Sequence, residues 1–584
     1  MTKRITRQRS KKKIRLKRNI SEKFLIGMIV IVFLLFIIAG IVIEKIFDVK
    51  GSYFLSSNSY KVTLYNDELK PAVTMPRGLL VSVKREKPLT DKQGGTFYRI
   101  IIKGKKYYVA KDNLVIDKKQ IVREKVVYVR TPIDIYKNIK AGQLLTLVNK
   151  GDELEVLDYD KVLDDGHVNI YQVKIKDKTG YIYSEYTVLD KDEALLHYQP
   201  EQYYKVHQQR NDTYGGGSAG NLDYYPVSKP LFDDNVMPDP IYALYLNSGS
   251  NVIRRIDEYI KLVEGTKINA FVVDIKDNES PGYRSKVMEA YSPINYRKAN
   301  NSFETYQAAI KKLKAAGFYV IGRITVFKDK YYVLDHPEHG IINTKTNEPL
   351  LHQNTYWPSP FQRGVWEFNV SLAKEAVLEM GFNEIQFDYV RFPDLTSRLE
   401  KEGIIDFRNI YQEEKAQVCQ RFLMYARDQL HPLKVYVGVD VFGESAHAYV
   451  TPYGQYWPAL SNVVDVISGM PYPDHFNKYE YGFKVPVWTV PYELLNYWGK
   501  NYVMVRQKEI PTPAKLRTWV QAYDVLPNRD NYVEYNAEEL EQQIRGLFDA
   551  GLVNGYMTWH GGSSINKYKQ QLEAYQKEYQ KEEN

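Results

Sequence analysis

Residues 384–393 of this chain read Glu-Ile-Gln-Phe-Asp-Tyr-Val-Arg-Phe-Pro. This stretch is predicted to form a buried β-strand that carries Asp388 to its carboxyl end, with Arg391 just beyond it. A β/α barrel presents its catalytic acids at this end of its strands. The alternative is that Asp388 only caps the loop after the strand. Arg391 is expected either to pair with Asp388 and stabilise its charge, or to form a surface ion pair of little energetic value.

Strands and helical patterns alternate between about residues 240 and 570. The predicted strands are residues 242–246, 270–275, 319–326, 385–389, 435–441, 464–468, 518–523 and 555–559. Helical periodicity lies between most of them, for example in residues 252–264, 302–316 and 369–380. Eight strands with intervening helices predict an α/β fold, a (β/α)₈ TIM barrel, over residues 236–570. Residues 571–584 are predicted to form a polar tail.

Polar side chains recur where the predicted strands end. They include Asp274, Arg323, Asp388, Asp440, Gln521 and His560. Because these strand ends face the active site of a barrel, the side chains are expected to converge on one pocket. Two carboxylates in a pocket suit glycoside hydrolysis, in which one protonates the leaving oxygen and the other attacks or activates water. The 50 Tyr residues suit sugar binding, although genome composition explains them equally well.

Six separated motifs resemble a bacterial family of glycoside hydrolase-like barrels, distant relatives of the α-amylase-like barrels. The motifs are residues 266–277, 322–329, 381–393, 439–443, 470–473 and 519–523, and the resemblance spans about residues 238–565. The resemblance implies a TIM barrel that acts on an extracellular polysaccharide. It also implies that Asp388, on the fourth strand, is the nucleophile and that an acid at the fifth strand is the proton donor.

Two acids lie at the fifth strand. Asp440 belongs to one of the motifs and is ranked ahead of Glu444, which follows on the loop. The alternative role for Asp440 is that of a buried Asp that holds a loop. The predicted substrate-binding residues are charged, polar and aromatic groups near the strand ends: Asp274, Arg323, Arg391, Tyr472, His475, Trp519, Gln521, Trp559 and His560.

No metal or cofactor site is predicted. His336, Glu338 and His339 lie in a predicted loop and lack the helical His-Glu-x-x-His spacing of zinc peptidases. Residues 215–220 have the spacing Gly-x-Gly-x-x-Gly, but no strand precedes them, as a dinucleotide site requires. We interpret residues 191–235 as a flexible linker that few contacts cross.

The amino-terminal segment predicts a membrane anchor. Residues 1–23 contain eleven Lys and Arg and one Glu, a charge of +10, so the rest of the chain carries −1. Residues 24–43 contain no charge and no proline and are long enough to span a bilayer as a helix. The basic run keeps the amino terminus in the cytoplasm, which places the other domains outside the cell. The alternative is a cleaved signal peptide, and no nucleic-acid partner is predicted.

Residues 58–190 are predicted to be all-β. An internal repeat relates residues 96–109 to residues 169–182. The second unit, residues 127–190, resembles bacterial SH3-like domains, and residues 58–120 resemble them more weakly. The resemblance implies either binding to cell-wall peptide or glycan, or a role as a spacer.

These features together predict a membrane-anchored glycosidase on the bacterial surface. The barrel would hydrolyse a cell-surface or cell-wall polysaccharide, and the SH3-like units would hold it away from the membrane. The first alternative is a non-catalytic carbohydrate-binding or wall-organising protein that retains the barrel. The second is a binding scaffold that depends on the SH3-like units alone.

Overall fold

The computed structural model describes residues 51–84, 88–201 and 215–580. The predicted basic segment 1–23 and the predicted membrane helix 24–43 lie outside the described residues. Within the described ranges, no helix is both long enough and apolar enough to cross a membrane.

The first of two compact units comprises residues 1–125 and 158–169, and its described part is built of short strands. Its sheets have the strand orders β4-β1-β8 and β3-β2-β7-β6-β5. The strands are β1 (Ser52–Leu55), β2 (Lys61–Tyr65), β3 (Pro71–Pro76), β4 (Leu80–Ser82), β5 (Leu89–Thr90), β6 (Thr96–Ile102), β7 (Lys105–Ala110) and β8 (Leu114–Val115). Alternating apolar side chains, such as Val62 and Leu64 of β2, form its core.

The second compact unit comprises residues 126–157 and 170–584 and begins with a sheet of seven strands. Their order is β11-β10-β14-β13-β12-β9-β15. The strands are β9 (Val126–Val129), β10 (Ile133–Asn138), β11 (Gln143–Val148), β12 (Glu153–Tyr159), β13 (Ile170–Ile175), β14 (Lys178–Tyr183) and β15 (Thr187–Val188). The likeness of this sheet, and of the strands before it, to SH3-like domains stays a prediction.

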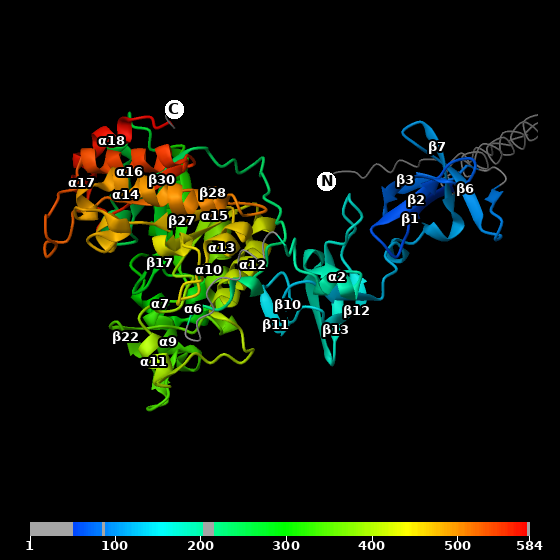
Figure 1. The fold of residues 1–584 in the computed structure, drawn as a ribbon, viewed down its shortest axis with the longest axis horizontal. Coiled ribbons are helices and arrows are strands. Elements are labelled where there is room, and N and C mark those ends of the chain that lie inside the picture. Colours follow the sequence, from blue (N-terminus) through cyan, green and yellow to red (C-terminus); the bar gives the residue numbers. More distant parts are fainter. Residues whose placement is uncertain (1–50, 85–87, 202–214, 581–584) are drawn as a thin grey trace, which may run out of the picture. The chain divides into compact units, whose positions relative to one another are not determined.

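The rest of the second unit is a mixed α/β fold around a nearly closed parallel sheet, as in a TIM-type barrel (Figure 1). The strand order is β28-β27-β26-β24-β19-β17-β16-β30-β29. The strands are β16 (Ile241–Leu246), β17 (Ala270–Asp277), β19 (Tyr319–Thr325), β24 (Glu384–Asp388), β26 (Tyr436–Phe442), β27 (Val466–Met470), β28 (Lys515–Leu516), β29 (Thr518–Gln521) and β30 (Gly555–Trp559). Only Arg517 separates β28, which pairs with β27, from β29, which pairs with β30, so one segment brings the two edges together.

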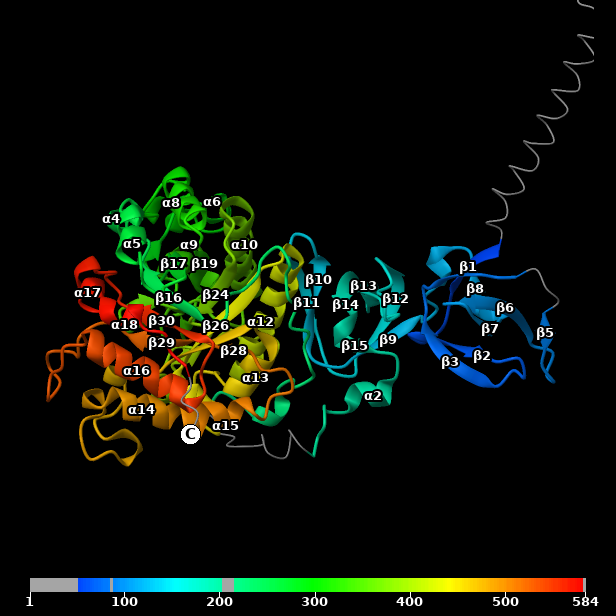
Figure 2. The same ribbon diagram turned by 90° about the horizontal axis from the view of Figure 1, so that it is seen from above.

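Helices cover the outside of the parallel sheet (Figure 2). They include α5 (Ile256–Leu262), α8 (Phe303–Ala315), α10 (Arg363–Met380), α12 (Lys415–Leu430), α13 (Trp457–Val463), α14 (Pro491–Trp498) and α16 (Ala537–Ala550). Local sequence sets their ends: the Ser302 side chain accepts a hydrogen bond at the start of α8, and Gly381, with a φ of 79°, ends α10. The alternation of strands and helices confirms the predicted barrel-like fold.

The seven-stranded sheet lies beside helices α10 and α12 (Figure 2). Buried polar groups join the sheet to the two helices. Arg363, at the start of α10, donates to Asp134 of β10 at 3.0 Å and to Glu413 at 2.8 and 2.9 Å. The hydroxyl of Tyr186 donates to Asp428 of α12 at 2.8 Å. The sheet and the barrel are therefore held together by buried charged and polar groups that serve as hydrogen-bond partners for one another.

The described end of the predicted linker, residues 215–235, is packed on the barrel, unlike the flexible segment that its glycine run suggested. From residue 215, where the structure describes it again, Leu222 and Tyr224 are buried in a small core shared with α12. A side chain at Gly217, whose φ is 113°, would meet Glu414 at 2.5 Å. Glycine serves here for close packing on the barrel rather than for mobility, which the composition of the run does not reveal.

We expect Arg363→Met to lower the free energy of unfolding of the second unit by about 3 kcal/mol. Asp134 would lose its cation inside the protein, and Glu413 would lose one of its two cations. Chemical denaturation of the full-length protein, followed by tryptophan fluorescence, measures the change.

The matched control is Arg398→Met, which removes an exposed pair with Glu402 and should leave the denaturation midpoint almost unchanged. Equal effects of the two substitutions would contradict a stabilising role for the buried Arg363 network.

Candidate active site

Strand β24 brings three polar side chains to one face. Glu384, Gln386 and Asp388 alternate along it, whereas Phe387 points the other way and contacts Phe422 of α12 with ring centroids 5.2 Å apart. All five residues of the strand are buried. A buried polar group without a partner costs free energy, so each of the three needs a partner from another strand. The strand thus carries Asp388 to the carboxyl end of the barrel.

Arg323 of β19 is the cation that binds Asp388. Its Nη2 and Nε donate to Asp388 Oδ2 at 2.6 and 3.1 Å, and its Nη1 donates to Asp274 Oδ1 of β17 at 2.7 Å. The backbone N–H of Tyr389 donates to Asp388 Oδ1 at 2.6 Å. Because Asp388 is only 5% exposed, these bonds replace most of its water. The predicted convergence of these three strand ends is present in the structure.

The predicted pairing of Arg391 with Asp388 is wrong. In the described structure Arg391 contacts other groups. Its guanidinium donates to Asp394 at 3.4 Å and lies over the ring of Phe442, 4.4 Å from the centroid. The cause is local: Tyr389 has a φ of 52°, in the left-handed region, and the chain turns there immediately after the strand. The cation beside Asp388 comes instead from the neighbouring strand.

Asp440 of β26 is fully buried in the same region. Its Oδ1 accepts hydrogen bonds from Gln386 Nε2 at 2.6 Å and from Trp519 Nε1 at 2.7 Å. Its Oδ2 lies 3.9 Å from Arg323 Nε and has no hydrogen-bond partner among the described residues. Burial, and then the charge of Asp388, raise the pKa of Asp440 well above its usual range. Asp440 is thus held inside the protein by Gln386 and Trp519, and its position fits the alternative role better than proton donation to a substrate.

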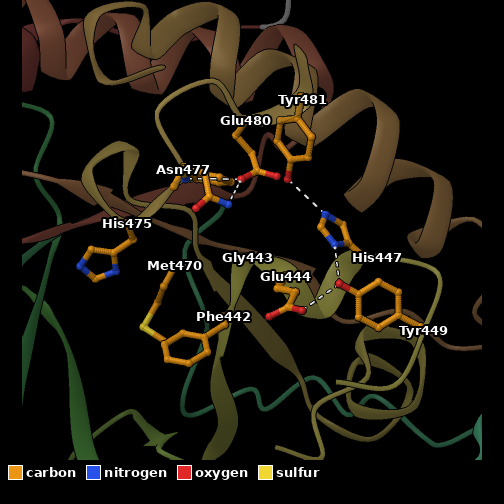
Figure 3. Close-up of a pocket in the computed structure, with 11 residues that line it drawn as sticks. Phe442, Gly443, Glu444, His447, Tyr449, Met470, His475, Asn477, Glu480 and Tyr481 are labelled. Carbon is orange, nitrogen blue, oxygen red and sulfur yellow. Dashed lines mark hydrogen bonds between the residues drawn. The ribbon is translucent and has the colours of Figure 1, made fainter. Parts of the chain in front are cut away.

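Glu444 lines a cavity beside the carboxyl ends of β26 and β27 (Figure 3). Tyr449 and Tyr453 donate their hydroxyl protons to the two Glu444 oxygens at 2.8 and 2.9 Å. The cavity has a volume of about 430 Å³ and is lined by Phe442, Gly443, Glu444, His447, Tyr449, Met470, His475, Phe476, Asn477, Glu480 and Tyr481. Neither Asp388 nor Asp440 lines it, so access to the cavity favours Glu444 over Asp440, the reverse of the predicted order.

Aromatic and imidazole rings form much of the cavity wall. His447 lies 3.2 Å from the hydroxyls of both Tyr449 and Tyr481, which fixes the three rings (Figure 3). Burial lowers the pKa of His447 and of His475, so both imidazoles are neutral at pH 7. Sequence reasoning missed most of this wall because it lies in loops, where no periodicity marks a residue. The abundance of tyrosine was the one available signal.

The other predicted substrate-binding residues serve mainly inside the protein. His475 lines the cavity, whereas Trp519 is bonded to Asp440. Gln521 accepts the backbone N–H of Asp474 at 3.0 Å and so holds the loop after β27.

Tyr472, Trp559 and His560 lie around these groups rather than on the cavity wall. Tyr472 is 4% exposed, and its ring lies edge-on to His475, with centroids 5.1 Å apart. Trp559 packs beside Arg323, 5.1 Å from its guanidinium carbon. His560 contacts the ring of Tyr568, with centroids 6.0 Å apart.

One group of possible metal ligands is present in the described part of the chain. The ligand atoms of His336, Glu338 and His339 lie within 4.8 Å of one another. None of the three residues lines the cavity. The sequence prediction excluded this group because it considered only helical spacing.

Residues 243–568 match the model of a family described as "Putative glycosyl hydrolase domain". The match covers more than half of the chain. The chain belongs to this family. The matched range includes the parallel barrel, with Asp388 and Glu444, and leaves the seven-stranded sheet outside the family domain.

The chain is also similar to several solved structures. One is a hypothetical protein from Ruminiclostridium thermocellum, with 32% identity over 34% of this chain and 97% of that chain and a TM-score of 0.29. Another is the PgaB (BpsB) glycoside hydrolase domain from Bordetella bronchiseptica, with 14% identity, 57% and 99% coverage and a TM-score of 0.39. A class V chitinase from Pseudomonas fluorescens has 13% identity, 58% and 100% coverage and a TM-score of 0.34. No curated protein matches. With such low TM-scores, the family assignment depends on the family match alone.

We expect the stability of this glycosyl hydrolase domain to depend on pH through the carboxyl group of Asp274. Burial, which outweighs the attraction of Arg323, raises the pKa of Asp274 from 3.8 to about 6. The folded protein therefore keeps a proton that the unfolded chain loses, so stability present below pH ~4 is lost as the pH rises through ~6. We expect the free energy of unfolding of the wild type, relative to Asp274→Asn, to fall by roughly 2–3 kcal/mol between pH 4 and pH 7.

Denaturation series at constant ionic strength test this expectation. Asp406→Asn, at an exposed position of the short strand β25 (Ile405–Asp406), is the control for loss of an Asp outside the Arg323 cluster. A difference between wild type and Asp274→Asn that does not change with pH would contradict the assignment.

Proposed function

We propose that this protein is a glycoside hydrolase that acts on a cell-surface or cell-wall polysaccharide, with Asp388 and Glu444 as its two carboxylates. The observation that carries the proposal is the position of Glu444, on the wall of an aromatic cavity of about 430 Å³ beside the strand ends. TIM barrels place their active sites at this end of the sheet. Membership of a glycosyl hydrolase family supports the same reaction class.

Asp388 does not line the cavity, and we propose it as the second carboxylate because it stands at the carboxyl end of β24 with both of its oxygens fixed. Arg323 binds one oxygen and the backbone N–H of Tyr389 binds the other. Burial and the charge of Asp388 raise the pKa of Asp440, nearby, which disfavours a second buried negative charge. Such prior orientation reduces the reorganisation that the reaction would otherwise require.

Glu444 is suited to give a proton to the leaving oxygen. The hydroxyls of Tyr449 and Tyr453 donate to its carboxylate, and a hydroxyl can also rotate to accept a proton from the acid form. Both protonation states of Glu444 therefore have partners during a reaction cycle. The rings of Tyr449 and Tyr481 offer faces for sugar residues.

We expect Asp388→Asn and Glu444→Gln each to lower kcat by at least about a hundredfold on a glycan identified in a screen of cell-surface polysaccharides. Asp388→Asn should also weaken the fold, because Arg323 loses one of its charged partners inside the protein. Activity is therefore compared at a temperature where circular dichroism shows both variants to be folded.

Asp406→Asn is the control and should retain full activity. Full activity of the folded Asp388→Asn or Glu444→Gln variant would reject its assignment. Equal glycan binding by all variants, with no hydrolysis by the wild type, would favour the alternative of a non-catalytic carbohydrate-binding protein.

We also infer that residues 24–43 anchor the protein in the cell membrane, with the amino terminus in the cytoplasm. Support comes from the uncharged run of twenty residues and the +10 segment that precedes it. Protease added to spheroplasts should therefore digest the barrel and leave a short membrane-protected fragment. Recovery of soluble protein that begins near residue 40 would show cleavage instead.

A further inference from the structure

We propose that His336, Glu338 and His339 bind a divalent transition-metal ion such as Zn²⁺, through two imidazole nitrogens and one carboxylate oxygen. The three ligand atoms already lie within 4.8 Å of one another. Zn²⁺ binds these same groups at about 2.0–2.2 Å, so small side-chain rotations close the site. A water molecule completes the coordination, because the site is partly open to solvent.

The local fold brings the three side chains together. Helix α9 (Lys330–Asp335) ends immediately before His336, and a 3₁₀ turn, Pro337–His339, follows it. The turn places Glu338 and His339 beside the last turn of the helix. Asp329 caps α9 by accepting the N–H of Tyr332 at 2.9 Å, which fixes the helix from its other end.

His336 has the hydrogen-bond pattern of a metal ligand. Its Nε2 lies 2.6 Å from the carbonyl oxygen of Tyr291, and its Nδ1 lies 3.1 Å from Glu338 Oε1. Both neighbours are acceptors, but a neutral imidazole carries a single N–H. When Nε2 donates to the carbonyl, the lone pair of Nδ1 faces the carboxylate, and a metal ion between them satisfies both. Ligating imidazoles commonly donate their other N–H to a backbone carbonyl in this way.

The imidazole of His339 is also held in position by its neighbours. Its Nδ1 lies 2.9 Å from the hydroxyl of Tyr332, which can accept a proton and leave the lone pair of Nε2 for a metal. Its ring also lies against the start of helix α10, where a Cβ atom added at Gly364 would come within 2.7 Å of it. Glycine at this position therefore makes room for the imidazole.

The exposure of the three side chains is compatible with a metal ion. The side chain of Glu338 is 60% exposed and that of His336 is 31% exposed, so an ion can enter from solvent. None of the three residues lines the cavity of Glu444, so the ion would have a structural role. It would fix the turn that directly follows α9. The competing explanation for the His336–Glu338 contact is a simple ion pair with a doubly protonated imidazole.

Metal titration of the full-length protein, purified in detergent without an affinity tag, tests the proposal. We expect one equivalent of Zn²⁺ per chain in competition with a chromophoric chelator, and visible Co²⁺ absorption bands that Zn²⁺ abolishes. Glu338→Gln changes one exposed side chain and should weaken Zn²⁺ binding by at least about tenfold. His339→Ala should abolish the Co²⁺ bands.

Two matched variants serve as controls. Glu279→Gln removes another exposed carboxylate, and His352→Ala removes a histidine of the short strand β22 (Leu351–His352). Both variants should bind Zn²⁺ as the wild type does. The proposal is rejected if the wild type retains no Zn²⁺, or if Glu338→Gln and Glu279→Gln bind it equally. In the first case, the His336–Glu338 contact is an ion pair only.

Discussion

The carboxyl end of the barrel is organised around one buried guanidinium, that of Arg323. Removing this charge from water is costly, and the cost is offset only because Asp274 and Asp388 approach it to 2.7 and 2.6 Å. The three residues come from β17, β19 and β24, so the pairing also joins three neighbouring strand ends. The same bonds that stabilise the fold thereby orient Asp388. The proposed chemistry and the stability of the barrel cannot be varied independently at this position.

Strand β24 shows how such pairing specifies a β-barrel. Glu384 accepts from Arg517 at 2.8 Å, and Gln386 donates to Asp440 at 2.6 Å. Asp388, at the end of the strand, completes the series with Arg323. A slip of one residue would turn all three side chains toward the apolar helices and would leave their partners unpaired. Polar pairing inside the barrel therefore fixes the register of the sheet, in addition to the burial of apolar side chains.

Much of the barrel could be predicted because strand and helix periodicity are local properties of the sequence. The convergence of Asp274, Arg323 and Asp388 followed from parallel strands alone, since their ends meet at one edge. Prediction failed where the local backbone conformation decides which side chains meet. Arg391 follows Asp388 by three residues, but the left-handed turn at Tyr389 separates the two side chains. The glycine run before the barrel has the same composition whether it serves mobility or close packing. The cavity wall lies in loops, where spacing carries no information about proximity.

The buried network between the seven-stranded sheet and the barrel limits how the chain can be recombined. A module joined by an exposed tether can be exchanged for another of the same fold, because neither partner depends on the other. Here an exchanged sheet without equivalents of Asp134 and Tyr186 would remove one hydrogen-bond partner from Arg363 and one from Asp428. The barrel would then expose polar groups on α10 and α12 that had lost part of their hydrogen bonding. The sheet is thus not an independently exchangeable module. A functional chimera has to contain the sheet and the barrel together.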